Sequence, residues 1–154
     1  MIGRRARAQA VVWLAVLLPA FFLPVLGLSV DASVLFDARR DLQNVADAAA
    51  RVGAMEIDRN FLVAPGNPTG QIRLDEQAAR AETVRYLRDR AHLDDRGGSW
   101  ERPEVANNTV TVTVKRELKP PFLRLFTSKR TFEITATGHA RPCSGVSQQV
   151  MTCE

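Results

Sequence analysis

An uncharged apolar run of twenty-one residues, Ala10–Val30, constrains this chain more than any other feature. A bilayer core about 30 Å thick is crossed by about 20 apolar residues in an α-helix that rises about 1.5 Å per residue. Ser29, at the far end, is the only polar side chain in the run. The run therefore predicts a single membrane-spanning helix, with the rest of the chain built outside the bilayer.

The charges on either side of this run predict its orientation. Arg4, Arg5 and Arg7 precede it without any acidic residue, whereas Asp31 begins a flank of mixed charge. Lysine and arginine favour the cytoplasmic side of a membrane. We therefore expect a cytoplasmic N-terminus and an extracytoplasmic body.

A cleaved signal peptide is the competing interpretation, because a basic start, an apolar stretch and small residues around Val30–Ala32 fit one. Two observations favour a retained anchor. The apolar run is longer than the about 7–15 residues of a signal-peptide core. The helical pattern also continues through the supposed cleavage site.

Two prolines, Pro19 and Pro24, lie inside the predicted span, and Gly27 follows them. Proline removes a backbone donor, and a membrane helix tolerates it where other groups satisfy the freed carbonyls. The pattern is consistent with an ordinary kink. It is equally consistent with a helix that bends or locally melts when it moves from the bilayer into an assembly.

The formal charge of +4 arises mainly at the membrane flank. Three of the 21 basic residues precede residue 8, which leaves 18 basic against 17 acidic residues in the remainder. No basic stripe with interleaved aromatic residues is present, so the charge does not indicate a nucleic-acid partner. The length, 154 residues, leaves room for one small domain beyond the span.

Cys143 and Cys153 are the two cysteines of the chain. Outside the cytoplasm they can form a disulfide, which would close a short loop and contribute about 2–3 kcal/mol. Free thiols are the alternative. A metal site would need further ligands, and the chain has only His92 and His139 to offer.

The apolar run passes without a turn signal into an amphipathic stretch from Asp31 to about Asp58, so the sequence predicts one long continuous helix. Small alanines are frequent on its apolar face and allow a neighbouring element to approach closely. This stripe either packs on the chain's own domain or docks on helices of partner proteins. Its residues recur every three or four positions, as one face of a helix requires: Leu35, Ala38, Leu42, Val45, Ala49 and Val52.

The remainder of the chain predicts a small α+β body. A turn-rich break at Ala64–Gly70 precedes a second helix from about Leu74 to His92. Two stretches then alternate apolar and polar residues, Asn108–Lys115 and Thr131–Thr137, and we expect them to pair as antiparallel strands. A further short strand is expected near Trp100–Val105 or in the C-terminal tail.

Motifs for catalysis or metal binding are incomplete. Asp31–Leu35 begins like the D-x-S-x-S metal site of von Willebrand type A domains but lacks the second serine. The G-x-x-x-x-G-K-[ST] phosphate loop and the G-x-S-x-G elbow are absent, and no third group is evident to orient His139 beside Cys143. Asn107–Thr109 matches a glycosylation acceptor. We expect no enzyme, no cofactor, no metal and no small-molecule substrate.

Three segments resemble the N-terminal region of TadE/TadG-like proteins of the tight-adherence (Flp) pilus assembly system: R-A-Q-A-V-V-W-L-A-V-L-L-P, L-S-V-D and A-R-R-D-L-Q-N-V-A-D-A-A-A-R-V-G-A. The likeness is strongest over residues 7–54. The V-T-V-T-V-K, F-L-R-L-F and I-T-A-T-G-H-A-R segments resemble the small periplasmic body of that family. The family-motif and helix-packing residues are Asp31, Leu42, Gln43, Asn44, Ala46, Asp47, Ala48 and Ala49.

The resemblance implies a bitopic, pilin-like protein of a bacterial envelope that helps to build or anchor adhesive Flp pili, as a minor pilin or pseudopilin. Two departures from the family pattern limit how far the resemblance extends. Gly3 is followed by arginines and alanines, without the glutamate that follows the cleavage site of TadE-type pseudopilins. The chain is also too short for the larger C-terminal domain of full-length TadG-like proteins. We expect a TadG-like anchor joined to a TadE-sized body.

Our hypothesis is a non-enzymatic, membrane-anchored structural protein of a Tad/Flp-type pilus or related secretion apparatus, which acts in cell adhesion through helix packing. A membrane-tethered binding module unrelated to pili is the alternative. The expected organisation is a cytoplasmic tail (1–9), a transmembrane helix (10–30), an extracytoplasmic stalk helix (31–60) and a small α+β domain (61–154).

Overall fold

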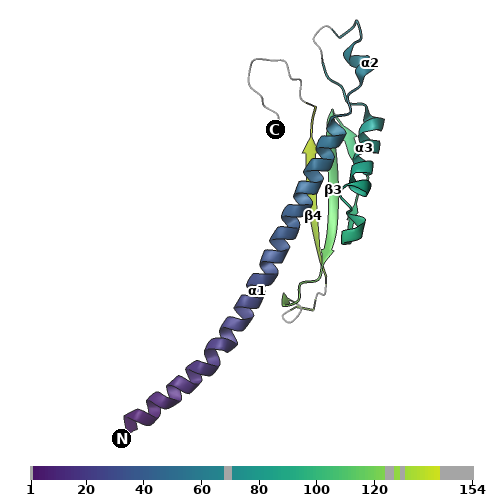
Figure 1. The fold of residues 1–154 in the computed structure, drawn as a ribbon. Helices are drawn as coiled ribbons and strands as arrows, with labels where there is room; N and C mark the ends of the chain where they lie inside the picture. Colours follow the sequence, from purple (N-terminus) through teal and green to yellow (C-terminus); the bar gives the residue numbers. More distant parts are fainter. Residues whose placement is uncertain (1, 68–70, 124–126, 129–130, 143–154) are drawn as a thin grey trace, which may run out of the picture. The chain divides into compact units, whose positions relative to one another are not determined.

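The computed structural model describes residues 2–67, 71–123, 127–128 and 131–142 (Figure 1). The chain forms two compact units. The first unit comprises Met1–Asp37 and Leu118–Phe132, and the second comprises Ala38–Glu117 and Glu133–Glu154. The units differ from the expected domains, whose boundaries stay a prediction.

The first helix, α1 (Ile2–Ala54), is a continuous α-helix of 53 residues that contributes to both units. Pro19 and Pro24 lie inside it without ending it. The helix ends at Ala54 and not near Asp58, because the following residues pair with a later segment. Ile57 forms an antiparallel bridge with Leu74, and the Asp58 N–H donates to the Arg73 carbonyl at 2.8 Å.

A single helical turn that the sequence did not suggest, α2 (Arg59–Leu62), follows this bridge. Asp58 caps it, because its carboxylate accepts the Phe61 N–H at 3.1 Å. The chain then passes through the predicted break, where Asn67 exchanges two hydrogen bonds with the backbone of Gln71, both at 2.8 Å. The side chain of Asn67 thus takes the place of a regular backbone turn.

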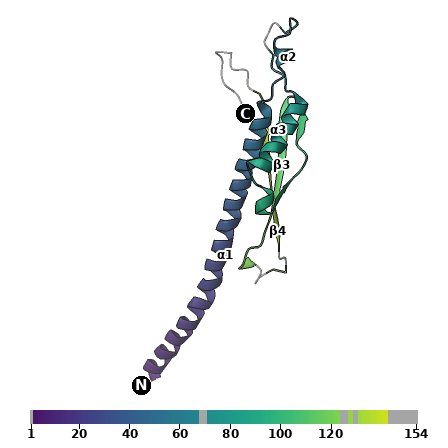
Figure 2. The same ribbon diagram turned by 45° about the vertical axis from the view of Figure 1, so that its right-hand side comes forward.

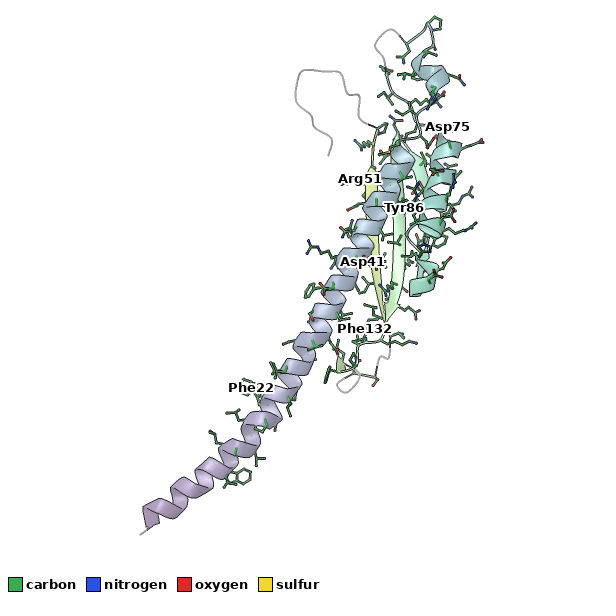
Figure 3. All side chains as sticks on the ribbon, in the orientation of Figure 1. Phe22, Asp41, Arg51, Asp75, Tyr86 and Phe132 are labelled. Carbon is green, nitrogen blue, oxygen red and sulfur yellow. The ribbon has the colours of Figure 1, made fainter. Side chains whose placement is uncertain are left out.

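The next helix, α3 (Glu76–Asp89), is shorter than the predicted Leu74–His92. It starts late because Leu74 is extended in the bridge with Ile57, and Asp75 is the N-cap. The Asp75 carboxylate accepts the N–H groups of Gln77 and Ala78, both at 3.0 Å. Figure 3 shows Asp75 at the beginning of this helix.

Four strands form one sheet: β1 (Gly98–Trp100), β2 (Glu104–Ala106), β3 (Thr109–Leu118) and β4 (Phe132–Ala140). A 3₁₀ turn, η1 (Asp94–Arg96), precedes β1, and Gly97 adopts the left-handed conformation after it. β1 and β2 both pair antiparallel with β3, with Trp100 opposite Val114 and Val105 opposite Val110. β4 also pairs with β3, and their arrows run in opposite directions (Figure 1). The expected α+β class is confirmed.

The β2–β3 connection is a two-residue hairpin, Asn107-Asn108. Both residues have positive φ, 52° and 59°, as a type I′ turn requires. The Asn108 side chain also binds the neighbouring connection, since its amide donates to the Ile72 carbonyl at 2.9 Å and its oxygen accepts the Leu74 N–H at 2.8 Å. The tripeptide noted as a glycosylation acceptor is therefore a structural turn.

The core of the second unit lies between the sheet and two helices. Val110, Val112 and Val114 point inward from β3 and are fully buried, whereas the threonines between them face the other way. The largest buried side chains of this cluster also include Leu87 of α3 and Leu42 of α1. Figures 1 and 2 show α3 and the C-terminal part of α1 running alongside the strands. The unit is thus a two-layer arrangement of helices on one face of a sheet.

Candidate membrane-anchoring and assembly helix

The N-terminal part of α1 exposes large apolar side chains with no protein packed over them. Trp13 is 67% exposed and Phe21 is 68% exposed, and Phe22 projects from the ribbon in Figure 3. By length and composition, one helix among the described residues, Val12–Ala54, is able to cross a membrane. An exposed apolar surface of this size is typical of a membrane or protein contact, so the N-terminal part of α1 is a candidate single-pass membrane span.

The polar side chains near the end of this apolar surface bond locally. The Ser29 hydroxyl donates to the Val25 carbonyl at 2.9 Å, and the Ser33 hydroxyl donates to the Val30 carbonyl at 2.7 Å. Both bonds satisfy the hydroxyl within its own helix, which lowers the cost of a serine at the edge of a bilayer. The residues that predicted the orientation, Arg4, Arg5 and Arg7, lie in the first turns of α1.

Asp31, one of the family-motif residues, is completely buried in the first unit. Its Oδ2 accepts the backbone N–H of Leu123 at 2.5 Å, from the connection between β3 and β4. One turn earlier, Gly27 lies against Phe122, so closely that a Cβ on Gly27 would come 2.5 Å from the Cδ1 atom of the ring. The sequence placed Asp31 in a family motif but did not indicate that it holds this connection.

The alanine stripe of α1 is covered by the chain's own second unit. Leu42, Ala46, Ala49 and Ala50 are each at most 1% exposed, and they belong to one core cluster with β3, β4 and α3. Of the two interpretations of this stripe, packing on its own domain is the one that the structure contains. Ala46 and Ala49 are buried in this packing, so they offer no exposed surface for docking on partner helices.

The small residues of the stripe allow α1 and β4 to approach closely. A Cβ on Gly138 would lie 2.6 Å from the Asp47 nitrogen and nearer still to the Ala46 carbonyl group. Further along α1, a Cβ on Gly53 would collide with the Thr83 hydroxyl of α3. Glycine inside a strand often marks such a backbone approach, and this signal was present in the sequence at Gly138.

Gln43 connects the family motif to the sheet. Its amide nitrogen donates to the Thr137 carbonyl of β4 at 2.9 Å and to the Asp47 carboxylate at 3.1 Å. Asn44 is exposed, while Asp47 and Ala48 are half-buried. The L-Q-N-V-A-D-A-A run therefore supplies buried apolar residues on one side and a hydrogen bond to the sheet beside them.

An open cleft of about 430 Å³ lies in the second unit, between the α2 region and the hairpin turn. Arg73 lies over the ring of Phe61, with 5.9 Å from its guanidinium carbon to the ring centroid. Both residues line the cleft together with Asn107 and Asn108. The groups in this cleft bind one another, and they include no convergent acid, base or nucleophile set.

The titratable groups elsewhere make surface pairs. His139 contacts the Thr111 hydroxyl through Nδ1 at 3.0 Å on the open face of the sheet, and His92 lies 3.4 Å from Asp95. No group of three or more histidine, cysteine or acidic residues able to hold a metal occurs among the described residues. Cys143 and Cys153, the predicted disulfide, lie outside the described residues.

A family model described as "Putative Flp pilus-assembly TadE/G-like" matches residues 5–56. This segment, about a third of the chain, is similar to TadE/G-like proteins, and we refer to it as the TadE/G-like segment. The matched range coincides closely with α1 (Ile2–Ala54), so the family resemblance expected from the sequence is confirmed for this helix. No curated protein and no solved structure matches the chain.

The TadE/G-like segment thus has two physically distinct parts. Its first part is the apolar candidate span, and its second part, from Ala38, is packed into the second unit. The segment is similar to a family model that is described by its role in Flp pilus assembly. The Pro19 and Pro24 kink and the membrane orientation stay predictions.

Proposed function

We propose that this protein is a non-enzymatic, pilin-like component of a bacterial cell membrane, with a cytoplasmic N-terminus and an extracytoplasmic body, which assists the assembly or anchoring of Tad/Flp-type adhesive pili. The single observation that carries this proposal is the division of the TadE/G-like segment. In the described part of the chain, one part exposes large apolar side chains, and the other is buried in the core of the second unit (Ala38–Glu117 and Glu133–Glu154), which we call the head.

The proposed mechanism is helix packing within the membrane. The exposed apolar side chains of α1, such as Phe21 and Phe22, are available to lipid and to the helices of other pilus-assembly proteins or pilins. In a bilayer such association relies on close packing of side chains, since lipid tails are as apolar as leucine.

This mechanism revises the role expected for Ala46 and Ala49. A charged residue at either position would be buried in the core of the second unit, where an unpaired charge is strongly destabilising. We therefore expect such a substitution to unfold the head, so a loss of partner binding would follow from unfolding. The informative positions for partner binding are on the exposed part of α1.

Site-specific photo-cross-linking in the host tests the proposal. A photoreactive phenylalanine analogue at Phe21 should give adducts that contain a pilin or another pilus-assembly protein. The same analogue at Arg85, which is 71% exposed on α3, is the control in the head. Adducts at Phe21 that contain only proteins unrelated to pili would refute the proposal and favour a tethered binding module.

A further inference from the structure

We propose that the segment Lys119–Leu123, between β3 and β4, is a membrane-surface contact that places the Phe122 ring in the outermost hydrocarbon of a lipid bilayer, just below the headgroups. The partner is the lipid surface around the end of the span that is marked by Asp31. This inference rests on the membrane anchoring of α1 and goes beyond it, because it assigns a second, non-helical membrane contact to the chain.

The depth of Phe122 follows from its contact with Gly27. Both residues belong to the first unit, and the ring lies against Gly27 without room for a Cβ. Gly27 is inside the apolar run and precedes Asp31 by four residues, or about 6 Å along a helix. The headgroup region on each side of a bilayer is about 5–7 Å thick. A span that ends near Asp31 therefore holds the ring of Phe122 in the outermost hydrocarbon, about 6 Å below the end of the span and close to the headgroups.

The chemistry of the segment fits such a boundary. Phe122 is 39% exposed although it is a large apolar residue, and Pro121 beside it is exposed as well. Lys119 is exposed on the other side of the buried Pro120. A lysine with an aromatic residue nearby is typical of chain segments that lie in the interface plane, where the ammonium group reaches the lipid phosphates.

Asp31 explains why the segment stays on the helix. A carboxylate at the edge of the hydrocarbon region is unfavourable unless it is shielded and hydrogen-bonded. The Leu123 N–H supplies a hydrogen bond to Oδ2, and Asp31 is fully buried, with Oδ1 unpaired among the described residues. The carboxylate thus fixes the segment, and the segment in turn separates the carboxylate from lipid.

Depth-dependent fluorescence quenching of the full chain in vesicles tests the proposal. The vesicles contain phosphatidylethanolamine and phosphatidylglycerol, with a quencher attached to the acyl chain either near the headgroup or near the bilayer centre. Three variants each carry one tryptophan: Trp100→Phe, which leaves Trp13; Trp13→Phe, which leaves Trp100; and Phe122→Trp with both native tryptophans replaced by phenylalanine. Pro121→Trp in the same background is a second reporter in case Phe122→Trp alters the circular dichroism spectrum.

We expect the central quencher to quench Trp13. In the Phe122→Trp variant, the shallow quencher should act several-fold more strongly than the central one. Neither quencher should act on Trp100. Quenching of Phe122→Trp and Pro121→Trp that is no stronger than that of Trp100 would overturn the membrane contact and indicate that protein covers the segment. If Trp13 is quenched in that case, the anchor stands. If Trp13 is not quenched, the anchor and the contact both fail.

The role of Asp31 has its own readout. Asp31→Ala in the Phe122→Trp background should reduce shallow quenching markedly, because the segment loses its attachment to α1. Asp37→Ala removes an exposed carboxylate from the same helix and should leave the quenching unchanged. Equal quenching in the two variants would overturn the assignment of Asp31 as the residue that holds the segment.

Discussion

Substituting Gly138 by alanine should separate α1 from the sheet. The added Cβ would lie 2.6 Å from the Asp47 nitrogen and closer to the Ala46 carbonyl group. These are backbone atoms of a helix, so no side-chain rotation can relieve the contact. The helix must move away from β4 by several tenths of an ångström or more. That movement strains the bond between Gln43 and the Thr137 carbonyl and loosens the packing of Ala46 and Ala49.

The magnitude follows from these two effects. Overpacking a well-packed core costs about 1–3 kcal/mol, and a weakened hydrogen bond adds about 1 kcal/mol. We therefore expect Gly138→Ala to lower the free energy of unfolding by about 2–4 kcal/mol. For a domain of the size of the second unit, this corresponds to a fall in Tm of about 10–30 °C.

The assay is thermal unfolding of the full chain in detergent micelles, followed by the fluorescence of Trp100, which packs against the core. Trp13→Phe removes the second tryptophan from the signal. Gly66→Ala is the matched control, because a Cβ there meets nothing within 4 Å. It should leave Tm unchanged or raise it slightly.

A double variant, Gly138→Ala with Ala46→Gly, tests whether the contact with the helix backbone causes the destabilisation. Because the clash involves backbone atoms of Ala46 and Asp47, Ala46→Gly should not rescue Gly138→Ala. The reasoning is refuted if Gly138→Ala unfolds within a few degrees of Gly66→Ala, or if Ala46→Gly restores its Tm.

Three further changes test other parts of the second unit. Leu87→Ala leaves a cavity at a fully buried position of α3 and should lower the free energy of unfolding by about 2–5 kcal/mol in the same assay; a loss below 1 kcal/mol would contradict the assigned core. Gln43→Ala leaves the Thr137 carbonyl without its partner and should cost about 1–2 kcal/mol, whereas Asn44→Ala at the exposed neighbouring position should stay within about 0.5 kcal/mol; equal effects would argue against the Gln43 bond. Glu101 raises the pKa of Lys115 above 10.5, mainly by accepting a hydrogen bond from its ammonium group and also by its charge, with a smaller effect of Glu133. The interaction of the Lys115 ammonium group with Glu101 contributes its full stability below the unfolded-state pKa of about 10.5. This contribution is lost as the pH rises through the higher pKa of the folded state. Glu101→Gln should therefore lower the pKa of Lys115, which NMR titration measures. The pH dependence of stability between pH 5 and 9 should not change. An unaltered pKa of Lys115 would contradict the pairing with Glu101.

Periodicity predicted the elements of this chain well because each carries a strong local pattern. The apolar run and the three-and-four spacing after it predicted one continuous helix, and α1 is continuous. The strict alternation at Val110, Val112 and Val114 predicted a half-buried strand, and these three valines are buried in β3. The strands extend further than the alternation did, to Leu118 and Ala140, because backbone pairing continues where the pattern fades.

The contacts between elements could not be predicted in the same way. The stripe at Ala46 and Ala49 defines a face of α1 but not what covers it, and the strand that approaches it most closely, β4 (Phe132–Ala140), comes about ninety residues later in the chain. The attachment of Leu123 to Asp31 involves a backbone N–H in an irregular connection, which leaves no sequence signature. Two asparagines in succession were a usable turn signal, since asparagine tolerates positive φ.

The central claim is that this protein takes part in assembling Tad/Flp-type pili, and a deletion of its gene in the host tests it most directly. Surface pili are counted by electron microscopy in the deletion strain and in strains complemented with the wild-type gene or with Gly66→Ala. The account predicts that pili are lost on deletion and restored by both genes. Normal numbers of pili in the deletion strain would contradict it.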